Sequence, residues 1–116
     1  MKTTFKIIKG NLYEYDSKGN EIHYKNSNGY EWWYEYDSNG KVIHFKDSNG
    51  DETWREYNSD GNEIHYKTSD GYERWYEYDS HGDLTHYKSS NGYETWYDSN
   101  GNKITKKEFD KLKSKL

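Results

Sequence analysis

Polar and apolar residues alternate along short segments of this chain, and a turn containing glycine separates each segment from the next. Residues 20–25 and 30–36 are typical segments, in which His, Tyr, Trp and Ile occur among charged residues. Such alternation, in segments rich in aromatic and β-branched residues, is typical of β-strands. The glycines recur every 10 or 11 residues, at Gly19, Gly29, Gly40, Gly50, Gly61, Gly71, Gly82 and Gly92. The pattern predicts an all-β protein, an antiparallel meander of about ten strands.

Two residue types reveal a longer period of 21 residues. Tryptophans stand at this interval at Trp33, Trp54, Trp75 and Trp96, and histidines stand at the same interval at His23, His44, His65 and His86. An internal period of 20 to 50 residues is typical of repeat proteins. We therefore expect tandem hairpin repeats in a single-layer or coiled sheet, and a function carried by a surface.

Each repeat contains two turns, which begin at residues such as Asn26 and Asp37 and end at glycine. This is type I turn chemistry, because Asp or Asn bonds the turn backbone and glycine accepts the left-handed conformation. Side chains alternate between faces with period two, so an odd repeat length requires two different loops. We expect a three-residue loop with a bulge at the Asn26 turn and a four-residue loop at the Asp37 turn.

This choice of loops sets the register of the strands. It places His23 opposite Trp33 and Lys25 opposite Glu31, and then Trp33 opposite His44. It also places Tyr36 opposite Lys41 and Glu31 opposite Lys46, so His–Trp and Lys–Glu ladders run along one face. The register also sets Glu21 opposite Glu35, which is unfavourable. The reverse assignment of loops remains the alternative, and it loses the Lys–Glu alternation.

The ends of the chain depart from the repeat. Within one domain, 1–116, we expect cap strands over 1–19, repeats over 20–104 and a helix in 105–116. Thr105 and Glu108 have the spacing of a capping box, and Phe109, Leu112 and Leu116 fall on one helical face. The sequence predicts a short cationic helix from about 106 to 115 that folds over the final strand or the acidic body.

Composition narrows the class of protein. Only 29% of residues are hydrophobic, but 19% are aromatic, which favours an ordered protein with a thin core. The formal charge is −4, with +4 on the last 14 residues and −8 on the rest, which argues against nucleic-acid binding. No segment resembles a signal peptide or a membrane span, so we expect a cytoplasmic protein without a membrane partner.

Catalytic and metal chemistry find little support in the sequence. There is no cysteine, and histidines two strand spacings apart, roughly 9.6 Å, are too far apart to share a zinc ion easily. Paired carboxylates recur in every repeat, whereas a catalytic site is normally unique. We expect no enzyme activity, no metal site and no cofactor. Histidines that titrate near pH 6.5 suggest pH sensitivity instead.

The phrase Tyr-Glu-Tyr-Asp-Ser-x-Gly begins at Tyr13, Tyr34 and Tyr76. It resembles the YD repeats of Rhs-type proteins over residues 11 to 104. That resemblance implies spiralling antiparallel sheets, which in this family enclose toxin domains or face the cell exterior. The Trp-Tyr pairs at Trp33 and Trp75 are similar to choline- and glucan-binding repeats. A fainter likeness is to MORN-type repeats of small antitoxin-like proteins.

Three functions follow as hypotheses. The first is a bacterial or phage protein that binds a protein partner, as an antitoxin, immunity or anti-defence factor. The others are a carbohydrate- or choline-binding module and a structural fragment of a larger shell or fibre. The candidate contact residues are aromatic or basic side chains of the strands: Trp32, Arg55, Arg74, Trp33, Trp54 and Trp75. Tyr and Trp are frequent at interface hot spots, and the aromatic faces also offer a route to a homodimer.

Overall fold

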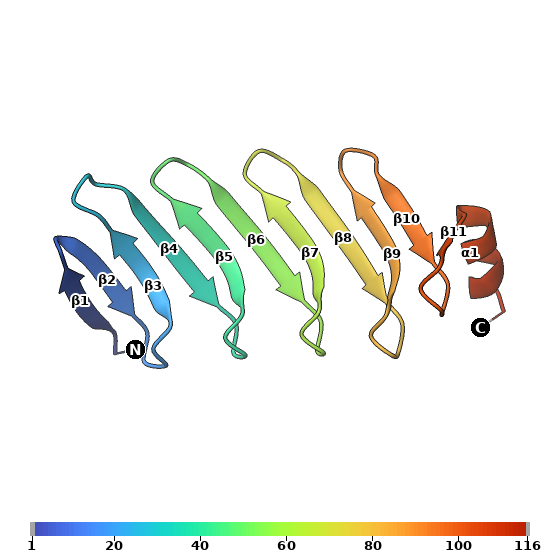
Figure 1. Ribbon diagram of the computed structural model, residues 1–116, viewed down its shortest axis with the longest axis horizontal. Coiled ribbons are helices and arrows are strands. Elements are labelled where there is room, and N and C mark those ends of the chain that lie inside the picture. The colour runs from blue at the N-terminus through green and yellow to red at the C-terminus, as the bar shows by residue number, and fades with distance from the viewer. Residues whose placement is uncertain (1, 116) are drawn as a thin grey trace. The chain divides into compact units, whose positions relative to one another are not determined.

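The computed structural model describes residues 2–115 and confirms an all-β fold with one short C-terminal helix (Figure 1). All strand pairs described are antiparallel, and the order of the strands in the sheet follows the chain. The strands and helix are β1 (Thr4–Ile8), β2 (Asn11–Tyr15), β3 (Glu21–Lys25), β4 (Glu31–Tyr36), β5 (Val42–Asp47), β6 (Glu52–Tyr57), β7 (Glu63–Thr68), β8 (Glu73–Tyr78), β9 (Leu84–Ser89), β10 (Glu94–Tyr97), β11 (Lys103–Ile104) and α1 (Lys106–Lys113).

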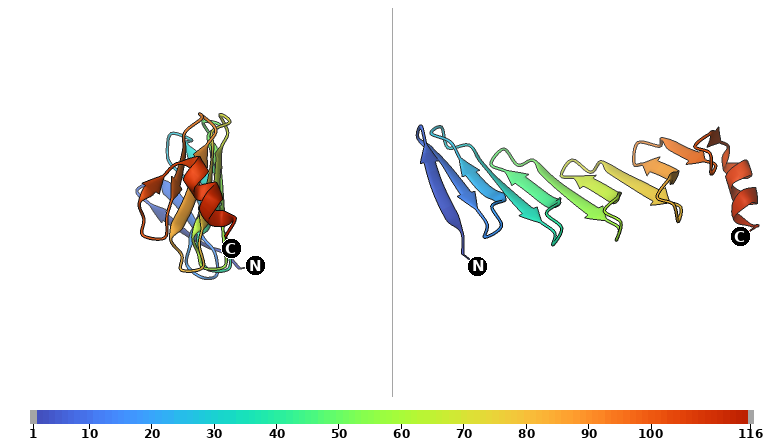
Figure 2. Two further views of the ribbon diagram at one scale, coloured as in Figure 1. Left: turned by 90° about the vertical axis from the view of Figure 1, so that its right-hand side faces the viewer. Right: turned by 60° about the horizontal axis from the view of Figure 1, so that its bottom comes forward.

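The chain divides into two compact units. The first takes in the residues up to Arg55 together with Thr68–Asp70, and the second takes in Glu56–Lys67 and the residues from Gly71 onward. In the first unit β1 to β5 form a single layer, and no helix covers either face among its described residues (Figure 2). In the second unit α1 lies beside β10.

The sheet has no buried apolar core. Among residues 2–115 the buried side chains are polar: Asp47, Ser89 and Thr95. Asp47 begins a turn, where its carboxylate accepts hydrogen bonds from the Tyr30 hydroxyl at 2.8 Å and from the backbone N–H groups of Asn49 and Asp51. Contacts between neighbouring strands must therefore supply most of the stability.

Both families of turn have the same geometry. At the Asn26 turn the N–H of Asn26 donates to Tyr30 O, and at the Asp37 turn the N–H of Asp37 donates to Lys41 O, each at 2.9 Å. Gly29 and Gly40, which close these two turns, have φ of 88° and 83°, a conformation that favours glycine. The four-residue loop expected at the Asp37 turn is therefore wrong, since both turns have three loop residues.

The odd repeat length is absorbed inside the strands. Tyr36 pairs with Val42 but Glu35 pairs with His44, so Ile43 has no partner across the strand pair and forms a β-bulge. The same shift occurs between Glu14 and Tyr15 and between Glu77 and Tyr78. A bulge moves the register by one residue. It therefore provides the change of parity that was expected from a four-residue loop.

The register across the Asn26 turn is confirmed, with His23 opposite Trp33 and Lys25 opposite Glu31. The register across the Asp37 turn is wrong by two residues, because Trp33 lies opposite Lys46 and Glu35 lies opposite His44. From Glu35 inward the shift is even, so Trp33 and His44 keep their expected face, whereas next to the turn Tyr36 pairs with Val42 in place of Lys41. The shift interrupts the uniform ladders, because Trp33 no longer faces His44 and Glu31 no longer faces Lys46.

The helix begins as its sequence predicts. The Thr105 side chain accepts a hydrogen bond from the Glu108 N–H, and the Glu108 carboxylate accepts one from the Thr105 N–H, which completes the capping box. The Phe109 ring lies 6.1 Å from the His86 ring, so the helix contacts the last repeat through this residue.

A serine in the turn ties each repeat to the one before it. The N–H of Ser48 donates to Glu31 O at 2.9 Å, and the N–H of Glu31 donates to Ser48 Oγ at 3.0 Å. The same reciprocal pair joins Ser69 to Glu52 and Ser90 to Glu73. The serine therefore continues the hydrogen bonding beyond the end of the strand.

The reciprocal hydrogen bonds between Ser48 and Glu31 give a stability prediction. Ser48→Ala should lower the free energy of unfolding by about 1 kcal/mol, because it leaves the Glu31 N–H without its acceptor. Ser38→Ala, at the same position of the other kind of turn, should change it by less than about 0.5 kcal/mol. Urea unfolding of both variants measures the difference. Equal losses in the free energy of unfolding would contradict the role assigned to the Ser48–Glu31 hydrogen bonds.

Candidate functional site

The most regular side-chain arrangement in the protein is a histidine held between two glutamates of the neighbouring strands. His44 Nδ1 lies 2.8 Å from Glu35 Oε1 on β4, and His44 Nε2 lies 2.6 Å from Glu52 Oε2 on β6. We call this arrangement the histidine bridge. Since the histidine lies on the strand between the two glutamates, each bridge connects three strands.

The bridge occurs four times, with a glutamate nine residues before and eight residues after each histidine. In the first unit His23 lies 3.5 Å from Glu14 and 2.6 Å from Glu31. In the second unit His65 lies 3.0 Å from Glu56 and 2.8 Å from Glu73. His86 lies 2.7 Å from both Glu77 and Glu94.

Each bridging ring also stacks on a tryptophan of the following strand. The His23 and Trp33 rings lie 5.3 Å apart with an interplanar angle of 9°, and the His44 and Trp54 rings lie 5.6 Å apart at 21°. The second unit repeats the contact for His65 with Trp75 at 5.6 Å and His86 with Trp96 at 5.4 Å. The sequence-based expectation of histidines packed on tryptophan is confirmed.

The geometry of the bridge favours a protonated imidazole. A neutral histidine can donate from only one ring nitrogen, so its other nitrogen would face a carboxylate without a proton. Burial alone lowers the pKa of His44, but its hydrogen bonds to Glu35 and Glu52 outweigh burial and raise the pKa above the usual value. The hydrogen bond to Glu56 raises the pKa of His65, against burial and with help from Glu73.

We call the surface formed by these residues the His–Trp face. In the first unit it carries Trp33 and Trp54, and in the second it carries Trp75, with exposed fractions of 38%, 36% and 37%. Glu35, Glu56 and Glu77 are exposed beside their histidines. The face therefore presents partly exposed indole rings next to carboxylates, each ring held in place by a stacked imidazole.

The opposite surface, which we call the tyrosine face, is made of aromatic rings, mostly phenols, in contact with one another across neighbouring strands. Tyr24 contacts Tyr13 at 5.0 Å and Trp32 at 4.0 Å in the first unit, and Tyr76 contacts Tyr87 at 5.0 Å in the second. A hydrogen bond with Tyr72 raises the pKa of Tyr87 to about 12, with burial adding to the effect. The Tyr87 hydroxyl therefore stays neutral at physiological pH.

Trp32 and Arg74 occupy equivalent positions on this face in different units. Trp32 stacks on Tyr24 and donates from Nε1 to Glu21 Oε2 at 2.9 Å. Arg74 lies 4.2 Å over the Tyr66 ring, with a guanidinium nitrogen 4.0 Å from Glu63. An indole N–H and a guanidinium thus make the same two contacts, a ring stack and an approach to a carboxylate.

The six sequence-predicted contact residues do not share one surface. Within the first unit Trp32 and Arg55 lie on the tyrosine face, while Trp33 and Trp54 lie on the His–Trp face. Within the second unit Arg74 and Trp75 are likewise on opposite faces. Sequence reasoning missed the bridging glutamates, although their 21-residue interval was visible at Glu14, Glu35, Glu56 and Glu77 and at Glu31, Glu52, Glu73 and Glu94.

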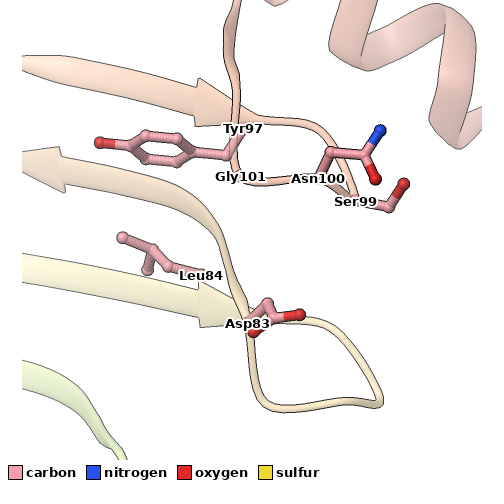
Figure 3. Close-up of a pocket in the computed structure, with 6 residues that line it drawn as sticks. All are labelled: Asp83, Leu84, Tyr97, Ser99, Asn100 and Gly101. Atoms are coloured by element: carbon pink, nitrogen blue, oxygen red, sulfur yellow. The ribbon is translucent and has the colours of Figure 1, made fainter.

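Two open grooves lie beside turns that begin with aspartate. The first, of about 520 Å³, is lined by Tyr34, Tyr36 and turn residues that include Asp16 and Asp37. The second, of about 440 Å³, lies in the other unit (Figure 3). Figure 3 shows Leu84 and Tyr97 on neighbouring strands, with turn residues Asp83, Ser99 and Asn100 around them.

Two further observations concern metals and membranes. Within residues 2–115 no group of three or more His, Asp or Glu side chains is arranged to hold a metal ion. The part of the chain that the structure describes also contains no helix of the length and apolar character needed to cross a bilayer.

The fold and the site define a repeat protein of tandem β-hairpins joined by carboxylate, imidazole and indole side chains. No family model and no curated protein matches the sequence. Among solved structures 40 chains match, including the crystal structure titled TcdB2-TccC3-TEV, with a TM-score of 0.59 and 17% identity. The match covers 84% of this chain but 5% of that chain, and it supports a YD- or Rhs-like repeat fold.

The histidine bridges give a pH prediction. Because the folded pKa of His44 and His65 is raised above the unfolded value of about 6.5, their stabilisation is present below that pH and is lost as the pH rises through the folded pKa. Urea unfolding should show a more stable protein at pH 6 than at pH 8.5. In the double variant His44→Gln with His65→Gln this difference should shrink, with a loss of about 1 kcal/mol per site at pH 6.

His81 provides the matched control, since it lies on an exposed turn. His81→Gln should retain the full difference in stability between the two pH values. A wild-type protein whose stability is the same from pH 6 to pH 8.5 would refute the protonated bridge.

Proposed function

We propose that this chain is a non-enzymatic repeat protein of the YD type that binds a partner protein through its His–Trp face. The observation that carries the proposal is the repeated partly exposed indole, at Trp33, Trp54 and Trp75, each fixed by a stacked histidine. Rigid tryptophans lose little conformational entropy on binding, and Trp is enriched among the residues that dominate interface affinity.

The charges beside the indoles narrow the chemistry of the partner. Glu35, Glu56 and Glu77 are exposed, so a partner that places apolar groups on the indoles would meet carboxylates at the edge of the contact. Complementary lysines or arginines would speed association and favour the correct partner. A binding protein of this kind fits an antitoxin, immunity or anti-defence role in a bacterium or phage. The four equivalent bridges argue against a unique catalytic centre.

The test uses three substitutions on one face and one on the other. A variant with Trp33→Ser, Trp54→Ser and Trp75→Ser should lose its stoichiometric partner in affinity capture from a bacterial lysate. Its affinity for that partner, once purified, should fall at least tenfold, because hot-spot residues each contribute about 2 kcal/mol or more.

Tyr93→Ser is the matched control, because Tyr93 is an exposed aromatic residue opposite Ser89, on the tyrosine face. It should retain the partner, and circular dichroism should show both variants folded. The proposal fails if the triple variant binds as tightly as the wild type, or if no protein is captured in a stoichiometric amount.

Carbohydrate binding is the second candidate function, and the two grooves favour it. Each combines tyrosine with aspartate and serine at the turns, and sugars bind by stacking on aromatic rings and by hydrogen bonding to polar groups. If this role is correct, a glycan array gives binding that Tyr97→Ala weakens severalfold and that the triple tryptophan variant retains. An array without any bound glycan would exclude it for the glycans tested.

A further inference from the structure

Strand β1 carries the most exposed apolar residues of the described chain. Phe5 is 60% exposed, Ile7 is 76% exposed and Ile8 is 49% exposed, and all five residues of β1 are exposed. β1 pairs with β2 on one side only, so its other side is an edge of the sheet. Natural proteins usually protect such edges, because the unpaired backbone groups can accept another strand.

The other end of the strand order is protected. β11 is only two residues long, and it is followed by α1, which contacts β10. A short edge strand beside a helix is a common way to prevent edge-to-edge association. Of the two edge strands within residues 2–115, β1 is thus the one that combines five residues with exposed apolar side chains. Pairing between like edges would form a closed two-fold dimer, whereas pairing between unlike edges would build a filament.

The β1–β2 turn determines which backbone groups of β1 are free. Lys9 and Gly10 form a two-residue loop with φ of 52° and 82°, as in a type I′ turn, and Ile8 pairs with Asn11 across it. Hydrogen-bonded and non-hydrogen-bonded pairs then alternate away from the turn. The N–H and C=O groups of Phe5 and Ile7 therefore point away from β2, toward an incoming strand.

We infer that β1 pairs antiparallel with β1 of a second copy of this chain, with the two Phe5 residues opposite each other. A two-fold axis at Lys6 would set two ammonium groups face to face, which is unfavourable. An axis at Ile7 would place Phe5 against Lys9, which lies in the turn. The axis at Phe5 avoids both conflicts, pairs Ile7 with Thr3 of the second copy and uses the outward backbone groups of both residues.

Lys6 fits this arrangement. Its ammonium group lies 5.6 Å over the Tyr15 ring, on the face opposite Phe5 and Ile7. It therefore stays on its own copy, while the apolar residues meet across the two-fold axis. A contact limited to one pair of edge strands is small, so we expect a weak dimer with a dissociation constant in the range from about 1 µM to 1 mM.

Sedimentation equilibrium of the full chain tests the inference. Between about 10 µM and 1 mM the average mass should rise from 14.0 kDa toward twice that value and no further. Ile7→Lys should remain monomeric over this range. Leu112→Lys, which replaces an exposed leucine of α1, should dimerise as the wild type does. A monomeric wild type, an Ile7→Lys variant that dimerises normally, or growth beyond a dimer would overturn the inference.

Disulfide cross-linking tests the register independently, since the chain has no cysteine of its own. Under oxidation Phe5→Cys should give a disulfide-linked dimer, because opposite residues of paired strands lie within disulfide distance. Ile8→Cys is the control, since the two copies of residue 8 would lie several residues apart along the strands. A cross-link in Ile8→Cys with none in Phe5→Cys would overturn the proposed pairing.

Discussion

The pairing of each histidine with glutamates on both neighbouring strands is the interaction on which this fold depends most. A sheet without a buried apolar core cannot rely on area removed from water, so contacts between strands must hold it together. A ring such as His44 contacts Glu35 and Glu52 through its two nitrogens and Trp54 through its face. One side chain thus fixes the spacing and register of three strands.

The 21-residue period follows from this geometry together with the turns. Each bridge needs the histidine and both glutamates on the same face of three successive strands. The two turns between these strands must therefore keep the three side chains on that face. Two identical three-residue loops would give an even register shift, and the bulge at residues such as Ile43 supplies the odd residue. Ser48 and its equivalents then fix the backbone of the glutamates that make the bridges. The constant spacing along the chain is therefore a consequence of backbone hydrogen bonding as much as of side-chain pairing.

Much of the fold could be predicted from the sequence, because its causes are local. Alternating aromatic residues, Asx-x-x-Gly turns and the Thr105 capping box each depend on a few adjacent residues, and the structure contains all three. The register across the Asp37 turn could not be derived in this way. A bulge at Ile43 and a four-residue loop satisfy the same parity, and the choice between them depends on pairing along the whole strand.

The candidate site could also be predicted only in part from the sequence. The stack of His23 on Trp33 was predictable, since both lie close to one turn. The bridge was not, because the expected Lys–Glu alternation gave glutamates such as Glu31 a lysine partner and set Glu35 opposite another glutamate. In the structure the Glu31 carboxylate lies 2.6 Å from His23 Nε2, although Lys25 is directly opposite on the neighbouring strand.

A physical reason explains why the carboxylate bonds to the imidazole. A lysine on an exposed strand loses little by leaving its ammonium group in water, whereas an imidazole packed against an indole is partly desolvated and gains more from a carboxylate partner. Stacking and ion pairing thus support each other. The tryptophan shields the histidine, the shielded histidine attracts the glutamates, and the glutamates keep the ring flat on the tryptophan. Because each bridge also orders its indole, the interaction that replaces a core also fixes Trp33, Trp54 and Trp75, the residues on which the proposed binding depends.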